Sequence, residues 1–504
     1  MSSKSVGRGI VKSLIFGFIV LLAPVALLAG GIEAVGYYRF HGMDQRIQIV
    51  TLEYARTGKM PPSLWKPHPI WHHGLNPDHE INHLNKFGFR GFDFPKQKRP
   101  SELRVICVGD STTQGWPLPF DLAYPYFLER FLSVALKDRV VNVINAGIGS
   151  HLSAFNLSYL GNYLLDFSPD YVLIKSAYND YAPFSYAAFE GDYTVAFPRI
   201  FDIETYPFPA TFWTRHTYIG KYLVARRLMG TQVRMAVDGN FGGTSSSVIE
   251  NNLKYINSYT SKIRAMAAAV SANGATPILL DLPVSEKPEY TPDWFRKIIG
   301  AFNGELDRVS REMKVKLIRT APQVAGADFF DQCHNSSQGH QRIAAQVANE
   351  ILAGMGKAAR FQEIVLAPGQ ISSPVIFEPG HELDQLLNPG MDGAAQVGGE
   401  AAAGPVPVII TLNEKVKNAY VFLSRGDFDT SDKITAFGLD PEAGWRQVYM
   451  ENHPEGDAAR RNAIMIPFAG VYSGFKLILQ KADPGKEGII SINRINIWTA
   501  QNMD

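Results

Sequence analysis

The sequence predicts an α/β domain built on a parallel sheet with helices on both faces, preceded by one transmembrane helix and followed by an antiparallel β-sandwich. Between Leu103 and Gly354, short apolar runs alternate with helical patterns, which is typical of a parallel sheet. Beyond Ala359, short runs at roughly regular spacing partly alternate apolar with polar residues, which favours a sandwich. An uncharged apolar segment near the N-terminus is long enough to span a bilayer.

The predicted anchor is Ser13–Ile32, which at about 1.5 Å per residue spans roughly the 30 Å core of a bilayer. Lys4, Arg8 and Lys12 precede it. The positive-inside rule places the N-terminus in the cytoplasm and the rest of the chain on the far side of the membrane. In a bacterium, this would be a single-pass inner-membrane protein with its main domain periplasmic or extracellular. A cleaved signal peptide and a buried core helix are the alternatives.

We expect four parts along the chain. Residues 1–40 form the cytoplasmic tip and the anchor, and residues 41–100 form an irregular stalk that packs on the next domain. Residues 101–360 form the α/β domain, and residues 361–504 form the sandwich, for which carbohydrate binding is a candidate role. An aromatic-rich insertion, 182–245, interrupts the α/β domain. Two roles fit this insertion: a lid or substrate wall beside the site, or extra packing against the stalk.

The expected elements follow from the hydrophobic patterns. The strands of the α/β domain are Leu103–Val108, Val140–Ile144, Tyr171–Lys175, Pro277–Leu282 and Lys316–Ile318. Its helices are Tyr124–Leu136, Leu152–Leu165, Val248–Val270, Pro292–Met313 and Gln338–Gly354. The strands of the sandwich are Val406–Leu412, Asn418–Leu423, Ile434–Leu439, Arg446–Met450, Ala463–Phe468, Phe475–Gln480 and Ile489–Trp498.

Composition and charge exclude several classes of protein. The 504 residues carry 49 Lys and Arg against 48 Asp and Glu, so a nucleic-acid partner is not expected. A mean hydropathy of -0.08 excludes a polytopic membrane protein. The cysteines, Cys107 and Cys333, are too few for a disulfide scaffold or a four-cysteine zinc site. Both cysteines map near the same end of the predicted sheet. They form either a disulfide or two buried thiols, and the sequence does not decide between these states.

Chemistry-bearing residues gather at the carboxyl ends of the predicted strands, where open α/β sheets place their sites. Gly109-Asp110-Ser111 follows the first strand, and Asp331-Gln332-Cys333-His334 precedes the last helix. A spacing of three lets the Asp331 carboxylate hold one ring nitrogen of His334 while the other faces Ser111, a nucleophile that needs a base. The segments Asn145–Ser150 and Asn179-Asp180 would bring backbone N–H groups and an amide to the same edge, where such donors stabilise an oxyanion.

In these motifs the chain resembles the SGNH (GDSL-type) hydrolase superfamily, over about Leu103–Met355. The resemblance implies a flavodoxin-like sheet, an acyl ester substrate, and neither a cofactor nor a metal. It also implies that Ser111 is the nucleophile, His334 the base and Asp331 the residue that orients the base. The backbone N–H of Ser111 and the side chain of Asn179 would be oxyanion donors.

The chain departs from the family pattern at two positions. The glycine that supplies a backbone donor falls at Ser150, and Gly149 would take that role after a shift of one residue. The third motif opens with Ala177 where glycine is usual. Upstream, Asn85–Gly91 resembles the lead-in of membrane-anchored family members associated with bacterial exopolysaccharide systems.

The expected function is therefore a serine esterase that removes a small acyl group, such as acetyl, from a cell-envelope or secreted polysaccharide. A polysaccharide O-acetyltransferase with the same triad and a non-catalytic glycan-binding or assembly protein are the alternatives. Polysaccharide-biosynthesis proteins are candidate partners. Trp445, Tyr449 and Trp498 are candidates for stacking on sugars, with core packing as the other role for each.

One further motif is expected to mislead. His79-Glu80-Ile81-Asn82-His83 fits the HExxH pattern of zinc proteases, which requires a helix. Pro77 precedes the motif and Gly88 follows it closely, which leaves room for only about two helical turns. Structural packing is therefore expected there, with an incidental metal site and a catalytic zinc site as the alternatives.

Overall fold

The computed structural model describes residues 3–43, 48, 51–52, 55–56, 65–79, 82–186, 189–193, 212–226, 246–367, 369–375, 377, 395–397, 405–425, 433–452, 463–480 and 490–502. The chain divides into two compact units, Met1–Pro67 with Thr194–Ser245, and His68–Tyr193 with Ser246–Asp504. Much of the predicted insertion 182–245 lies outside the described residues, as do Glu80 and Ile81 of the HExxH pattern.

The first unit contains the long helix α1 (Ser3–His41), the short helix α7 (Phe212–His216) and a helical stretch over 218–226. The predicted anchor lies within α1. Near the end of α1, the Glu33 carboxylate accepts the backbone N–H groups of Tyr218 and Ile219, which caps the start of the 218–226 stretch. Among the residues that the structure describes, no helix has the length and apolarity needed to cross a membrane.

The core of the second unit is a parallel sheet with the strand order β4-β3-β5-β6-β7. Its strands are β3 (Glu102–Gly109), β4 (Val140–Gly147), β5 (Tyr171–Lys175), β6 (Thr276–Leu280) and β7 (Lys316–Ile318). This confirms the predicted parallel sheet, and the order is the flavodoxin-like one. Gly109 at the end of β3 pairs with Gly147 of β4 and with Lys175 of β5. The carboxyl ends of these three strands therefore meet.

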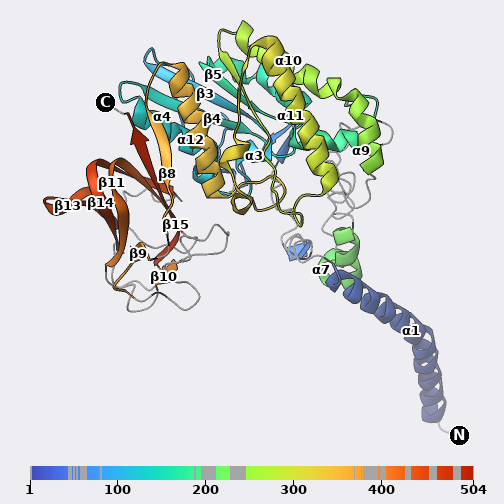
Figure 1. The fold of residues 1–504 in the computed structure, drawn as a ribbon. Coiled ribbons are helices and arrows are strands. Elements are labelled where there is room, and N and C mark those ends of the chain that lie inside the picture. The colour runs from blue at the N-terminus through green and yellow to red at the C-terminus, as the bar shows by residue number, and fades with distance from the viewer. Residues whose placement is uncertain are drawn as a thin grey trace. The chain divides into compact units, whose positions relative to one another are not determined.

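Helices cover both faces of this sheet (Figure 1). Helices α4 (Tyr124–Ala135) and α12 (Ser337–Gly354) share a core with side chains of β3. The opposite face carries α10 (Asn257–Ala272) and α11 (Asp293–Met313). Helix α5 (Ser153–Asn162) packs against α10. Two predicted helices are interrupted. A 3-10 turn, Leu164–Phe167, follows α5, and α9 (Ser246–Asn252) with a 3-10 turn, Leu253–Tyr255, precedes α10.

The segment predicted as an irregular stalk contains two short strands, β1 (Trp65–His68) and β2 (His72–Leu75). Its later part covers the edge of the parallel sheet, where Arg90 forms an isolated bridge with Asn145 of β4. The remaining short helices are α3 (Ser111–Gln114) and α6 (Tyr181–Phe184). The segment that precedes the α/β domain is thus attached by a backbone bridge to β4, the edge strand of the sheet.

The C-terminal residues form a separate antiparallel sheet in the order β10-β15-β11-β14-β12-β13, with β8 on β15 and β9 on β11. Its strands are β8 (Arg360–Ile364), β9 (Ile371–Ser372), β10 (Ala395–Val397), β11 (Val406–Arg425), β12 (Lys433–Asp440), β13 (Gly444–Asn452), β14 (Ala463–Gln480) and β15 (Ile490–Gln501). The predicted antiparallel pairing is therefore confirmed, but the described strands form one hydrogen-bonded sheet and not the two sheets of the predicted sandwich. The predicted pairs of strands within 406–423 and within 463–480 are wrong, because each pair is one long strand.

The pairing of β11 with β14 explains why each of these strands is long and unbroken. The register between these strands shifts between Thr411 and Val416 and again between Lys417 and Ala419. Both strands thus continue through irregularities instead of turning. The polar residues in the middle of β11 suggest a turn from sequence alone, but they are accommodated within the strand.

One hydrophobic core joins the β-domain to helices α4 and α12. Phe131 of α4 is fully buried, and its ring centroid lies 4.7 Å from that of Phe361, 5.4 Å from Phe422 and 5.3 Å from Trp498. The indole N–H of Trp498 donates to Gln341 of α12 at 2.9 Å. Trp498 therefore has the core-packing role and not the predicted alternative of stacking on a sugar.

Candidate active site

Ser111 is the first residue of α3, and Asp110 alone separates it from the end of β3. Asp110 caps this short helix, because its carboxylate accepts the Thr112 backbone N–H at 2.9 Å and the Thr112 hydroxyl at 2.8 Å. Gly109 has no space for a side chain, since a Cβ there would lie 2.3 Å from the Lys175 carbonyl oxygen. This tight turn holds Ser111 at the carboxyl ends of the central strands.

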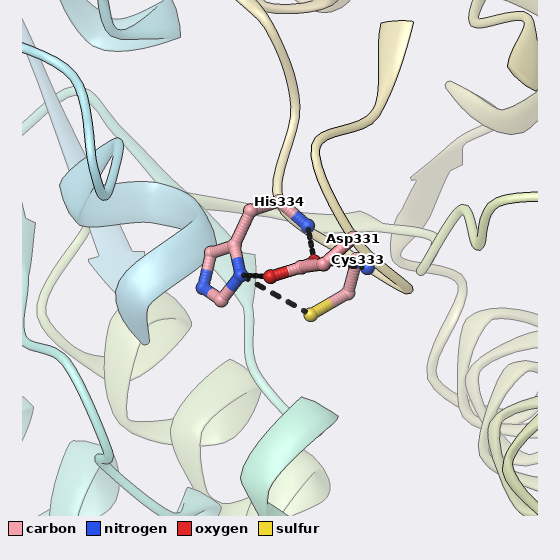
Figure 2. Close-up of side chains that lie close together, drawn as sticks. All are labelled: Asp331, Cys333 and His334. Atoms are coloured by element: carbon pink, nitrogen blue, oxygen red, sulfur yellow. Dashed lines mark hydrogen bonds and ion pairs between the residues drawn. The ribbon is translucent and has the colours of Figure 1, made fainter. Parts of the chain in front are cut away.

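The structure brings Ser111, His334 and Asp331 into one chain of hydrogen bonds. His334 Nε2 lies 2.8 Å from Ser111 Oγ, and His334 Nδ1 lies 2.7 Å from Asp331 Oδ2. The other carboxylate oxygen, Asp331 Oδ1, accepts the backbone N–H of His334 at 2.8 Å and that of Cys333 at 2.9 Å. Figure 2 shows this turn, in which the carboxylate is held on both sides while it faces the ring.

Charge in this turn favours an ionised carboxylate and a basic ring. Burial alone would raise the pKa of Asp331, but the hydrogen bond and charge of His334, together with the backbone N–H groups of Cys333 and His334, outweigh burial and lower it. Burial alone would lower the pKa of His334, but the Asp331 carboxylate hydrogen-bonded to Nδ1 raises it above its ordinary value. The Cys333 sulfur would add to this rise only as a thiolate, and its thiol is uncharged at neutral pH. An imidazole with this partner is a strong proton acceptor for the Ser111 hydroxyl.

The cysteines are free thiols, and both are buried. Cys333 Sγ lies 3.8 Å from His334 Nδ1. Burial raises the pKa of Cys333, and it does the same for Cys107 on β3. Both sulfurs are therefore uncharged at neutral pH, which leaves Asp331 as the anionic partner of His334.

In the described part of the chain, one group has the spacing of metal ligands. Asp331, Cys333 and His334 offer one oxygen, one sulfur and one nitrogen, all within 4.8 Å of one another. The oxygen and the nitrogen are 2.7 Å apart, which is a hydrogen-bond distance. Two such ligands of a tetrahedral zinc ion would be roughly 3.3 Å apart. The group fits a proton between ring and carboxylate better than it fits a metal.

The residues predicted for the oxyanion site differ in their surroundings. Ser150 is exposed and has a φ of 64°, in the left-handed region. The Gly149 N–H donates to Gln114 Oε1 at 2.8 Å, so this donor is engaged. The Asn179 side-chain amide donates to the His151 carbonyl at 3.2 Å. An amide nitrogen carries two hydrogens, and this contact uses one of them.

Gly147, the last residue of β4, shows how closely the following loop approaches α3. A Cβ at this position would lie 2.1 Å from the Gln114 backbone nitrogen. The backbones of the loop and of α3 therefore touch, and only glycine permits that contact.

Sequence reasoning missed several residues that support the site. Lys175 is fully buried and donates to the Thr112 hydroxyl at 2.6 Å. Arg90 donates to the carbonyls of Gln114 at 2.5 Å and Leu118 at 2.9 Å, which fixes the chain just beyond α3. His73 donates to the Gly149 carbonyl at 2.8 Å. The sequence offered a signal for Lys175, because it is a charged residue at the end of an apolar strand. It offered none for Arg90 and His73, because their contacts join residues far apart in the chain.

Comparison with known proteins agrees with this geometry. Residues 107–342 match the family model of the GDSL-like Lipase/Acylhydrolase family. The α/β domain is that of an SGNH-type ester hydrolase. The match includes Ser111, His334 and Asp331. No protein of curated function matches the chain.

Several solved structures resemble about half of this SGNH-type enzyme. A GDSL-like lipase from Bacteroides thetaiotaomicron is 16% identical, with 50% of this chain and 88% of that chain covered and a TM-score of 0.29. An acetylxylan esterase from Geobacillus stearothermophilus is 14% identical, with coverage of 49% and 94% and a TM-score of 0.33. The esterase EstA from Pseudoalteromonas sp. is 14% identical, with coverage of 50% and 99% and a TM-score of 0.30.

Proposed function

We propose that this protein is a serine esterase that removes acetyl groups from a cell-envelope or secreted polysaccharide through an acyl-enzyme on Ser111. The observation that carries the proposal is the hydrogen-bonded chain of Ser111, His334 and Asp331, with distances of 2.8 Å and 2.7 Å. This arrangement supplies a nucleophile, a base and an anion that orients the base.

The reaction follows from these positions. His334 Nε2 takes the proton of the Ser111 hydroxyl as its oxygen attacks the ester carbonyl, and Asp331 stabilises the imidazolium that forms. The imidazolium then gives its proton to the departing sugar oxygen, which leaves the acyl group on Ser111. A water molecule, deprotonated by His334, attacks the acyl-enzyme and releases the acid and the free serine.

The oxyanion that forms twice in this sequence needs donors. We assign them to the backbone N–H groups of Ser111 and Ser150 and to the side-chain amide of Asn179. Ser111 is the first residue of its helix, where a backbone N–H has no partner within the helix. Of the two loop candidates, Ser150 is favoured over Gly149 because the Gly149 N–H already donates to Gln114.

The proposed substrate and location rest on sequence features. A net charge of +1 suits a neutral or weakly charged glycan better than a polyanion. The uncharged segment Ser13–Ile32 behind Lys4, Arg8 and Lys12 supports an inner-membrane anchor with the enzyme outside the cytoplasm. Carbonate extraction of membranes tests the anchor. The full chain is expected in the membrane pellet, and its release into the supernatant would contradict the proposal.

The test of the function uses the purified full chain and p-nitrophenyl acetate. The wild type is expected to release nitrophenol, and Ser111→Ala is expected to lose that activity about 10³-fold or more. Ser150→Ala is the matched control, since it removes an exposed hydroxyl but keeps the backbone N–H. Equal rates for the wild type and Ser111→Ala would refute the proposal.

The same experiment separates hydrolysis from transfer. An acetylated oligosaccharide and an unacetylated acceptor are offered together, and the products are weighed by mass spectrometry. Free acetate without a heavier acceptor is the expected result. An acceptor that gains acetyl in a Ser111-dependent way would make the protein an O-acetyltransferase instead.

A further inference from the structure

The loop that carries Ser150 is held by the segment that precedes the α/β domain. His73 Nε2, on β2, lies 2.8 Å from the Gly149 carbonyl oxygen. In return, His151 Nε2 lies 2.8 Å from the His73 carbonyl oxygen. Each histidine ring thus bonds the backbone of the other segment, and the two segments fix one another.

The protonation of His73 follows from its partners. A carbonyl oxygen only accepts, so the hydrogen of His73 lies on Nε2. Burial lowers the pKa of His73 well below its ordinary value, so the ring is neutral and carries that one hydrogen. Its Nδ1 is then an acceptor and faces His72 Nδ1 at 2.8 Å. The His72 ring stacks on Phe155 of α5, with ring centroids 4.3 Å apart, which anchors this pair to the helix layer.

The bond from His73 acts on the peptide unit that contains the proposed donor. The Gly149 carbonyl and the Ser150 N–H belong to one planar trans peptide, in which they point in opposite directions. Fixing the carbonyl therefore fixes the direction of the N–H. A hydrogen bond to the carbonyl also polarises the peptide and makes its N–H a better donor.

The neighbouring peptides are held as well. Gln114 binds the Gly149 N–H at 2.8 Å, and Asn179 binds the His151 carbonyl at 3.2 Å. Between them, Ser150 has a φ of 64°, a conformation that side chains rarely adopt without such support. The contacts thus hold a strained residue whose own side chain is exposed.

We propose that His73 is a positioning residue for ester hydrolysis, which aims the Ser150 N–H at the developing oxyanion through the Gly149–Ser150 peptide. The proposal rests on the function proposed above. It gives His73 of β2 a role in the reaction, although this strand lies outside the residues that match the family model.

The test compares two replacements of His73 in the full chain. Gln keeps an N–H donor at about the reach of Nε2, whereas Met has a similar length and no donor. His68→Met is the matched control, because His68 lies on the neighbouring strand β1, where its described contacts are with the Ile70 N–H and the Trp71 ring and not with the loop. With p-nitrophenyl acetate, kcat/KM is expected to fall about 10- to 100-fold in His73→Met and less than about 5-fold in His73→Gln.

A second measurement separates the orientation of the Ser150 N–H from a general loss of structure at the site. Acetanilide is an unreactive analogue of the ground state, whereas a small alkylboronic acid adds to Ser111 as a tetrahedral anion. The inhibition constant of the boronic acid is expected to rise with the loss in kcat/KM in His73→Met, while that of acetanilide stays unchanged. Thermal unfolding of each variant checks that it is folded at the assay temperature. Where His73→Met does not fold, His73→Asn, whose amide is too short for the Gly149 carbonyl, replaces it.

The outcomes are distinguishable. A folded His73→Met as active as His73→Gln, or equal weakening of both inhibitors, would overturn the positioning role and leave the esterase function intact. Wild-type activity no higher than that of Ser111→Ala would overturn the proposed function, and this inference with it.

Discussion

Replacing Asp331 with asparagine removes the anion that stabilises the His334 imidazolium but keeps a side chain of the same size. The contact to be lost is the 2.7 Å hydrogen bond from His334 Nδ1 to Asp331 Oδ2. His334 acts as a base only when it is unprotonated. In the wild type, kcat/KM should therefore rise with pH through the raised pKa of His334, with its midpoint above 6.5.

The size of the change follows from the exposure of the pair. A carboxylate in contact with an imidazolium raises the pKa of the imidazolium by about 1–3 units. The Asp331 side chain is 42% exposed and that of His334 16%, so solvent screens part of the interaction. We therefore expect the midpoint to move to lower pH by about 1–2 units in Asp331→Asn. The maximal rate should fall on the order of 10²- to 10⁴-fold, because the ring loses its orientation.

The assay is the pH profile of kcat/KM for p-nitrophenyl acetate, corrected for spontaneous hydrolysis. Cys333→Ala is the control on the same turn. Because burial raises the pKa of the Cys333 thiol, the sulfur carries no charge at neutral pH, and the midpoint of this variant should stay close to that of the wild type. A midpoint that stays in place or moves to higher pH in Asp331→Asn would refute this account of the base.

Three other variants test the loop and the domain junction. Gly147→Ala would place a Cβ 2.1 Å from the backbone of α3 and should abolish esterase activity. The control, Gly161→Ala, places a Cβ with nothing within 4 Å and should leave kcat/KM unchanged. Equal activities of the two variants would contradict the close contact. Ser150→Gly should keep activity and raise the free energy of unfolding by about 0–1 kcal/mol, because it removes left-handed strain at some cost in chain entropy; a tenfold loss of kcat/KM would instead give the hydroxyl a role. Phe131→Ala should lower the free energy of unfolding by about 3–5 kcal/mol in a denaturant titration, while the more exposed Trp445→Ala should cost little, and similar costs would refute the shared core.

The parts of the site that sequence predicted best are local in the chain. Asp331 and His334 are three residues apart, and one turn is enough to join them. Ser111 follows directly from the end of an apolar strand, where a parallel sheet places its reactive groups. The wider arrangement was also accessible, because the alternation of strands and helices restricts the order of a parallel sheet.

The parts that sequence did not reveal depend on contacts between distant residues. His73 and Gly149 are 76 positions apart, and no periodic pattern links a histidine ring to a backbone carbonyl. The long strands β11 and β14 continue through polar residues only because each is the other's partner. The core shared by α4 and the β-domain likewise joins side chains from opposite ends of the second unit, such as Phe131 and Trp498.

The most direct test of the central claim is covalent labelling of the nucleophile. The full chain is treated with an alkyl fluorophosphonate, digested, and mapped by tandem mass spectrometry. The account predicts a single phosphonyl group on Ser111, with labelling strongly slowed in His334→Ala and loss of esterase activity in step with its formation. No adduct on Ser111, or activity that survives complete labelling of Ser111, would contradict it.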